Sequence, residues 1–192
     1  MTQPTYLSAN LDFSAEDTLQ NLVDAGRIAS RTIVHTQGKQ IGVIGLTTPA
    51  LPYISSPRNV IVDPNIVGIV QDHIDTLTSE GINKIVLISH LQSIKEDSAL
   101  VTQLTGLDIV IAGGGDELLT NDPSIALPGM SVYGEYPMKV NDFNNDTVYL
   151  VTTPGEYVYV GHLVVEFDEN GVVTGIDDIS NPVLVTNTIG DS

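Results

Sequence analysis

Short apolar runs alternate with helix-like segments through the middle of the chain. Three runs have the length and composition of β-strands: 40–46, 84–89 and 108–112. Between the first two, apolar residues recur at the spacing of one helix face over 66–77. A further helix is predicted over 96–104. This alternation predicts an α/β fold with a mostly parallel sheet and helices packed on it.

The segment before this core contains shorter elements. A strand-like run at 6–11 is followed by Ser14, a residue type common at helix N-caps, and by a short stretch of helical spacing. The runs 32–36 and 40–46 flank a short connection that contains a glycine, which predicts a β-hairpin. The proline-rich stretch 47–64 is predicted to form an ordered surface loop over the strand ends.

The C-terminal third has a different pattern. Strand-like runs follow one another without helices between them, at 148–152, 157–167 and 172–179. The sequence Asp-Glu-Asn-Gly at 168–171 is a strong turn signal between the last two. This region is predicted to be antiparallel β. The stretch 121–146 before it, rich in Pro, Gly, Asn and Asp, is either a long functional loop or a partly mobile segment.

The composition excludes several classes of protein. The 192 residues suffice for one domain with a sizeable core, and no apolar run approaches the roughly 20 residues of a membrane-spanning helix. Seven Lys and Arg against 24 Asp and Glu give a formal charge of -17, which argues against nucleic-acid binding. Such a surface favours cations or is simply solvated. Without cysteine, disulfides, thiolate nucleophiles and cysteine-based zinc sites are excluded.

Residue types that bind metals follow two of the predicted strands. The run 84–89 leads into His90, and neutral imidazole is a common metal ligand. The run 108–112 leads into a glycine turn and an acidic pair: Gly113, Gly114, Gly115, Asp116 and Glu117. Carboxylates bind divalent cations, and glycines let backbone amides approach an anion closely. Because ligands of open α/β sheets bind beyond the carboxyl ends of the strands, a metal or phosphate site is predicted here.

Structural roles explain the same residues. A histidine at a strand end can serve only a loop hydrogen bond, three glycines also suit a tight turn, and the acidic pair would cap a helix starting at Leu118. The acids Asp122, Asp142 and Asp146 do not follow the calcium-loop pattern. Solvated or structural roles are expected for the other histidines: His35, His73 and His162. Without a Gly-x-Ser-x-Gly elbow or a thiol, a serine or cysteine hydrolase is disfavoured.

Several segments, in order and spacing, resemble the 5'-nucleotidase branch of the calcineurin-like metallophosphatases: 6–10, 38–48, 84–91, 106–114, 154–157 and 160–163. A variant class of bacterial alkaline phosphatases carries a similar Gly-Gly-Gly-Asp-Glu sequence. The resemblance implies part of a four-layer αββα sandwich, with a parallel or mixed sheet followed by antiparallel strands. It also implies hydrolysis of phosphomonoesters or nucleotides with two divalent metal ions (Zn, Mn, Mg or Ca), in the periplasm or outside the cell.

The resemblance assigns roles to residues at the two strand ends. His90 matches the family's Ser-His metal ligand, and Asp116 matches the second ligand of its Gly-His-x-His or Gly-His-x-Gln motif. Gly114 stands where that motif has its first histidine. Asp116 and Glu117 would then compensate with oxygen ligands and shift the metal preference toward harder ions. Gly113, Gly114 and Gly115 would allow backbone approach to phosphate.

The family's Asp-x-His, bridging Asp and Gly-Asn-His motifs lie before the first strand of this chain. Residues 1–192 are therefore expected to form a single domain, the C-terminal portion of a catalytic domain that lacks its N-terminal metal-binding half. The catalytic residues are expected upstream, this chain alone should be inactive, and its exposed apolar surface should favour homo-oligomers. The alternatives are an inactive acidic binding module that retains the fold and a calcium-stabilised secreted scaffold.

Overall fold

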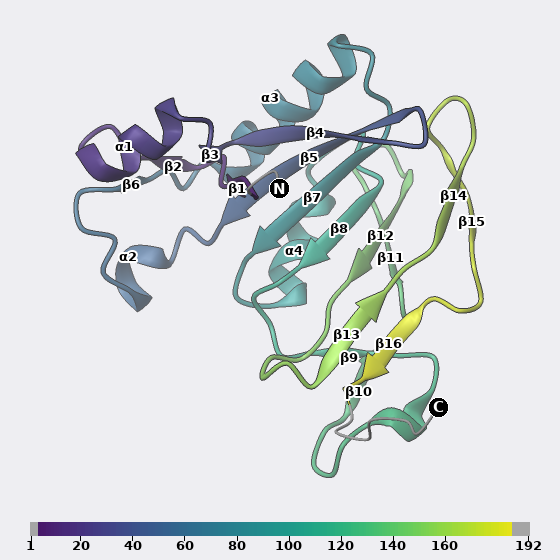
Figure 1. Ribbon diagram of the computed structural model, residues 1–192. Helices are drawn as coiled ribbons and strands as arrows, with labels where there is room; N and C mark the ends of the chain where they lie inside the picture. Colours follow the sequence, from purple (N-terminus) through teal and green to yellow (C-terminus); the bar gives the residue numbers. More distant parts are fainter. Residues whose placement is uncertain (1–3, 186–192) are drawn as a thin grey trace, which may run out of the picture.

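A six-stranded mixed sheet forms the centre of the computed structural model, which describes residues 4–185 (Figure 1). In spatial order its strands are β11 (Met138–Asn141), β12 (Thr147–Val151), β8 (Ile109–Ala112), β7 (Ile85–His90), β5 (Lys39–Thr47) and β4 (Arg31–Thr36). β5, β7, β8 and β12 run parallel, and the edge strands β4 and β11 are antiparallel to their neighbours. The predicted α/β fold with a parallel or mixed sheet is confirmed.

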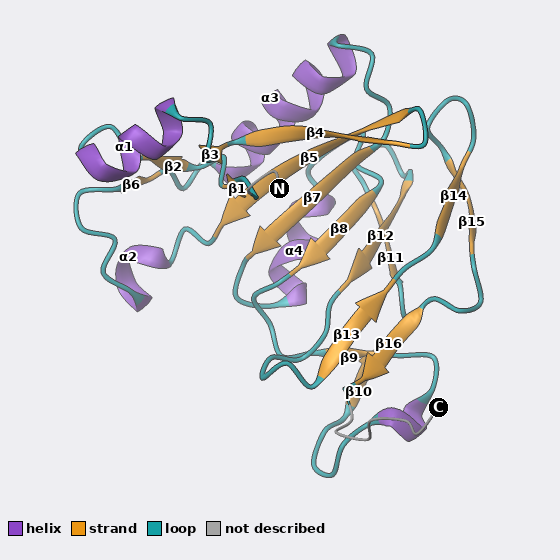
Figure 2. Ribbon diagram, viewed as in Figure 1, coloured by secondary structure: helices purple, strands orange, loops and turns teal. Residues whose placement is uncertain are grey.

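Helices α3 (Ile66–Ser79) and α4 (Ile94–Val101) pack on one face of this sheet (Figure 2). A row of paired, fully buried residues crosses the sheet on that face: Ile44, Leu87, Val110 and Leu150. Val70, Ile74 and Leu77 of α3 belong to the same apolar cluster. Full burial of one such side chain contributes roughly 1.5–3 kcal/mol. This cluster holds the helices against the sheet.

The opposite face of the sheet is only partly covered. Ile88 of β7 pairs with Ile111 of β8, and each side chain remains 43% exposed. Strands of the C-terminal region lie over part of this face and border an open hollow of about 890 Å³. The lining of the hollow includes sheet residues and residues from the C-terminal strands: Val86, Ile109, Tyr159, Leu163 and Val165. One face is therefore a closed core and the other an open apolar surface.

Short ladders and helices surround the central sheet. In the N-terminal region β1 (Tyr6–Leu7) pairs with β3 (Ile28–Ala29), and β2 (Leu11–Asp12) with β6 (Ile61–Val62). Later in the chain β9 (Leu118–Leu119) pairs with β10 (Val132–Gly134), β13 (Tyr159–His162) with β16 (Asn181–Leu184), and β14 (Val165–Phe167) with β15 (Val173–Ile176). The remaining helices are α1 (Asp17–Asp24), α2 (Leu51–Ile54) and the 3₁₀ helix η1 (Pro123–Ile125). None of the helices among residues 4–185 has the length and hydrophobicity needed to cross a bilayer.

The structure confirms the predicted hairpin of β4 and β5, as well as α1 and α3, and it changes several other boundaries. The run 6–11 is divided into β1 and β2, and the predicted loop 47–64 contains α2 and β6. α4 begins at Ile94 and ends at Val101, earlier than the predicted 96–104. The stretch 121–146 contains η1, β10 and β11 and is thus partly regular. Most of these elements are shorter than the segments whose periodicity predicted them.

The C-terminal third differs from its predicted pattern in three ways. The run 157–167 forms two strands, because the Val164 amide donates to Ser180 Oγ (3.0 Å) instead of to a ladder partner. The prediction of a helix that starts at Leu118 is wrong, because Leu118 and Leu119 form the buried strand β9. β12 lies parallel to β8 in the central sheet, so this region is not wholly antiparallel. The other ladders, β13 with β16 and β14 with β15, are antiparallel as predicted.

Asn10 fastens the N-terminal segment to the end of β5. Its Nδ2 donates to the carbonyl oxygens of Thr47 (2.8 Å) and Asp63 (3.2 Å), and its Oδ1 accepts from the Thr47 amide (3.0 Å). The side chain is 2% exposed, so these bonds are shielded from water. The Ala9 amide also donates to the Gly45 carbonyl (2.8 Å). The segment around Asn10 is therefore bonded to the end of β5 in the central sheet.

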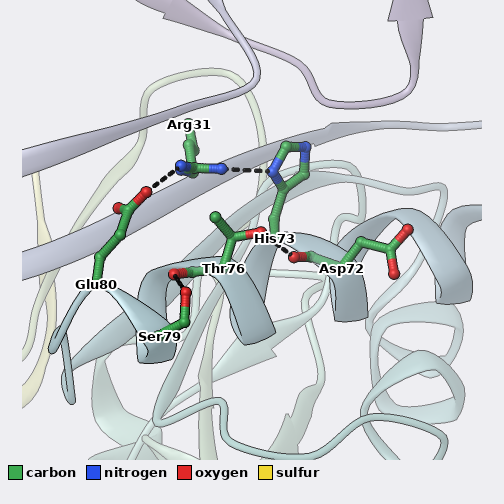
Figure 3. Close-up of polar contacts among 6 residues, drawn as sticks. All are labelled: Arg31, Asp72, His73, Thr76, Ser79 and Glu80. Atoms are coloured by element: carbon green, nitrogen blue, oxygen red, sulfur yellow. Dashed lines mark hydrogen bonds and ion pairs between the residues drawn. The ribbon is translucent and has the colours of Figure 1, made fainter.

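Arg31 connects the edge strand β4 to α3 (Figure 3). Its guanidinium bonds to Glu80 Oε1 at 2.8 Å and to His73 Nδ1 at 3.3 Å. Burial lowers the pKa of His73, and the positive charge of Arg31 acts in the same direction. The imidazole is therefore kept neutral and accepts the bond from Arg31. His73, expected to be solvated or structural, lies in this contact between helix and strand.

The close approach of β1 to β5 predicts the effect of substitution at Gly45. A Cβ at Gly45 would lie 2.3 Å from the backbone oxygen of Leu7, whereas a Cβ at Gly134 would meet only Leu119 Cδ2 at 3.5 Å. We expect Gly45→Ala to lower the free energy of unfolding by about 1–3 kcal/mol, because backbone must move. Gly134→Ala should change it by less than about 0.5 kcal/mol. Urea unfolding of both variants measures this, and equal losses would contradict the packing described.

Candidate functional site

The ends of β7 and β8 lie side by side at one edge of the sheet. Ser89 pairs with Ala112, and the Gly113 amide donates to the Ser89 carbonyl at 2.9 Å. His90 is the last residue of β7, and its carbonyl accepts from the Thr48 amide at 3.0 Å. The structure therefore places His90 and the glycine turn next to each other, at the carboxyl ends of parallel strands. This is the edge where α/β sheets bind ligands.

The pleat of β7 sends Ser89 and His90 to opposite faces of the sheet. Ser89 is 2% exposed and its hydroxyl contacts Asp97 of α4, on the helical side. Successive strand residues alternate in direction, so the exposed side chain of His90 lies on the open side. Its register partner there is Thr47 of β5. His90 is accessible to a ligand that approaches the open face.

Close packing explains the glycine turn without any ligand. A Cβ at Gly114 would lie 1.3 Å from the carbonyl oxygen of Leu91, and a Cβ at Gly115 would lie 1.9 Å from Glu117 Oε2. At Gly114 the obstacle is backbone, so this position requires glycine while the turn keeps its path. At Gly115 the obstacle is the end of the flexible Glu117 side chain, which can move aside, so a larger residue is less costly there. A histidine at position 114 would need the turn to move away from Leu91.

Asp116 and Glu117 have different surroundings. Asp116 is exposed, and its Oδ1 accepts from the amide of Gly155 at 3.3 Å. Glu117 is partly buried, and its Oε2 has no hydrogen-bond partner among the described residues. That oxygen lies against Gly115, at the place a side chain there would occupy. Of these two acids, Asp116 therefore has the more exposed carboxylate.

Asp97 is a buried acid beneath the same edge, and the motif analysis missed it. It is 1% exposed on α4 and accepts a short hydrogen bond from Ser89 Oγ. Burial raises the pKa of Asp97 to about 6, against the lowering effect of that bond, and the charges of Glu96 and Glu117 raise it further. The spacing in the sequence could have indicated its burial. Asp97 comes three residues after Ile94, so both lie on the buried face of α4.

The predicted metal ligands do not form a complete site. Among residues 4–185, no group of three or more histidine or acidic side chains is arranged to hold a metal ion. His90 and Asp116 offer an imidazole nitrogen and a carboxylate oxygen, which suit ions such as Zn²⁺ or Mn²⁺. Glu117 lines the same hollow as Asp116, and its predicted role as a further ligand stays a prediction. The roles of His90 and Asp116 as metal ligands therefore stay predictions.

Known proteins match nearly the whole chain. The 5'-nucleotidase of Diplobatis ommata is 31% identical over 185 residues, which are 95% of this chain and 30% of that protein. The probable 5'-nucleotidase of Treponema pallidum is 32% identical over 184 residues. The solved 5'-nucleotidase precursor of Thermus thermophilus superposes with a TM-score of 0.82 at 32% identity, over 94% of this chain and 33% of that one. This chain is homologous to a segment of the 5'-nucleotidases.

The resemblance to the 5'-nucleotidase branch is thereby confirmed. The chain spans about 30% of the length of the curated relatives it matches. The calcineurin-like phosphoesterase YfkN of Bacillus subtilis shares the fold, with a TM-score of 0.59 and 17% identity over 94% of this chain and 55% of that one. No model of a known protein family matches the sequence.

The buried carboxyl of Asp97 predicts a pH dependence of stability. Its pKa in the folded protein, about 6, exceeds the value of 3.8 expected for the unfolded chain. The stabilisation from its bound proton is complete below pH 3.8 and is lost as the pH rises through 6. Asp97→Asn has no such titration. Between pH 4 and 7 the variant should therefore gain stability relative to the natural chain, by on the order of 3 kcal/mol. Urea unfolding across this range measures the difference, and a constant difference would contradict the burial of the charge.

Proposed function

We propose that this chain is the C-terminal portion of a metallophosphatase catalytic domain in a longer protein that hydrolyses nucleotides or other phosphomonoesters. The observation that carries the proposal is the match to 5'-nucleotidases over 95% of this chain but 30% of those proteins. The location of His90 at the end of β7 and of Asp116 in the turn after β8 agrees with it. We place the protein in the periplasm or outside the cell, which phosphatase assays on cell fractions would test.

In this proposal the chain supplies part of a site for two divalent ions. His90 is one ligand and Asp116 another, and the amides of the glycine turn approach the phosphate. The bound ions would polarise the phosphate and lower the pKa of the attacking water. The remaining ligands and the catalytic residues come from the rest of the longer protein. Because Asp116 supplies oxygen where the family has a histidine motif, harder ions such as Mn²⁺ or Mg²⁺ are preferred.

The open face of the central sheet supports the view that the chain is part of a larger domain. Ile88 and Ile111 are exposed in the middle of β7 and β8, beside a hollow of about 890 Å³. Apolar surface of this kind is characteristic of an interface. We propose that the rest of the longer protein covers it. In the isolated chain a second copy would take that place, although a charge of -17 opposes self-association.

A second candidate function is an acidic binding module that keeps the fold without the chemistry. The crowding at Gly114 favours it, because a histidine there would collide with Leu91 while the turn keeps its path. The lack of a three-ligand group among residues 4–185 agrees with it. Such a module would not hydrolyse phosphate esters even as part of its full-length protein.

Hydrolysis assays separate the two candidates. AMP and an aryl phosphate should be hydrolysed by the full-length protein with Mn²⁺, Zn²⁺, Mg²⁺ or Ca²⁺, and not by residues 1–192 alone. Replacing His90 or Asp116 by Ala in the full-length protein should lower kcat/KM by more than about 100-fold, because each removes a metal ligand. His35→Ala is the control, since His35 is exposed on β4.

The outcomes have distinct meanings. Inactivity of the full-length protein with every metal would support the binding module, and full activity of the His90 and Asp116 variants would refute their role as ligands. Size-exclusion chromatography of the same proteins tests the open face. The isolated chain should elute as a dimer or larger species, and the full-length protein should not associate through this face.

A further inference from the structure

Asp97 occupies a position where a charge is costly. The other buried residues of α4 are apolar: Ile94, Leu100 and Val101. One carboxylate oxygen of Asp97 accepts from Ser89, and the other, Oδ2, is buried and without a hydrogen-bond partner among the described residues. A half-satisfied buried carboxylate destabilises a fold compared with an apolar residue of similar size. The core alone therefore gives no reason for an acid here.

Among the described residues, the side chain of Asp97 has one hydrogen bond, and it acts on the end of β7. Its donor, Ser89, immediately precedes His90 in the chain and pairs with Ala112 of β8. The carbonyl of Ser89 accepts from the Gly113 amide at 2.9 Å. Ser89 is thus bound to α4 through its side chain and to the glycine turn through its backbone. Fixing Ser89 therefore fixes the end of β7, which carries His90, and the start of the glycine turn.

The charge of Asp97 also acts electrostatically on residues at the ends of β7 and β8. Electrostatic attraction links its carboxylate to His90, and repulsion links it to Glu117 beside the glycine turn. Asp97 lies on the helical side of the sheet and is 1% exposed, whereas His90 lies on the open side. It therefore cannot touch a substrate, and any effect on chemistry must pass through Ser89 and His90.

We infer that Asp97 is a positioning residue that holds the strand end carrying His90 in place through the hydroxyl of Ser89. The inference rests on the proposed function, since it gives His90 the role of a metal ligand. Partners behind a metal ligand fix its orientation, and their loss typically weakens metal binding 10- to 100-fold. Here the partner acts one residue away along the strand, through the pleat that directs His90 to the open face.

Metal affinity tests this role independently of catalysis. Mn²⁺ is titrated by calorimetry into the metal-free full-length protein, at a temperature where every variant is folded by circular dichroism. His90→Ala first identifies the Mn²⁺ site to which His90 belongs. At that site Asp97→Ala and Ser89→Ala should each raise Kd by about 10- to 100-fold. The double variant should lose no more than either single one, because both remove the same hydrogen bond.

Two further variants exclude a merely structural effect. Asp97→Asn keeps an oxygen that can accept from Ser89, so its Kd should lie closer to the natural value than that of Asp97→Ala. Asp142 is a matched control: it is 6% exposed and accepts from the Gly106, Asn144 and Asp146 amides, near the start of β8. Asp142→Ala should lower the melting temperature and leave the Kd for Mn²⁺ within about twofold, because it is remote from the site.

The results separate this inference from the proposal beneath it. If His90→Ala leaves Mn²⁺ binding unchanged, the proposed function is wrong. If His90→Ala weakens binding while Asp97→Ala and Ser89→Ala do not, His90 remains a ligand and the positioning role of Asp97 is refuted. Equal weakening by Asp142→Ala would also refute it, since the effect would then follow from loss of stability alone.

Discussion

The burial of one row of residues, Ile44, Leu87, Val110 and Leu150, against α3 and α4 is the interaction on which the rest of the structure depends. Alternation along β7 then fixes the direction of every neighbour of Leu87. Ser89 faces the helices and His90 the open side because Leu87 is in the core. A register shift of one residue would exchange them. Core packing thus sets the orientation of the candidate ligand.

The same alternation explains the open face of the sheet. Strands that are apolar on both sides are typical of parallel sheets covered on both faces. Here α3 and α4 cover one face, whereas Ile88 and Ile111 remain exposed on the other. The C-terminal ladders cover this side incompletely and leave the hollow beside the glycine turn. The exposed apolar residues on this face agree with the proposal that the chain is part of a larger domain.

Three residues at one edge of the sheet depart from the usual rules of burial and packing. Asp97 is an acid on the buried face of a helix, Glu117 has a buried oxygen without a partner among the described residues, and Gly114 lies against a carbonyl. Each is unfavourable or restrictive by itself, and all three lie within the turn and helix around the ends of β7 and β8. Such violations are expected where function competes with stability. Their clustering at this edge agrees with the location of the candidate site.

Local sequence signals determined most of the architecture: the β4–β5 hairpin, the helix that ends before Gly81, and the strands that lead to His90 and the glycine turn. Periodicity and turn residues act over a few positions, so they are readable from the chain alone. Contacts between residues far apart in the sequence determined the side-chain arrangement of the candidate site. Ser89 with Asp97, Gly114 with Leu91 and Gly155 with Asp116 depend on how the turn, α4 and the C-terminal region pack together. The adjacency of the strand ends was therefore predictable, whereas the burial of Glu117 and the contact of Asp97 were not, because side-chain packing has no local signature.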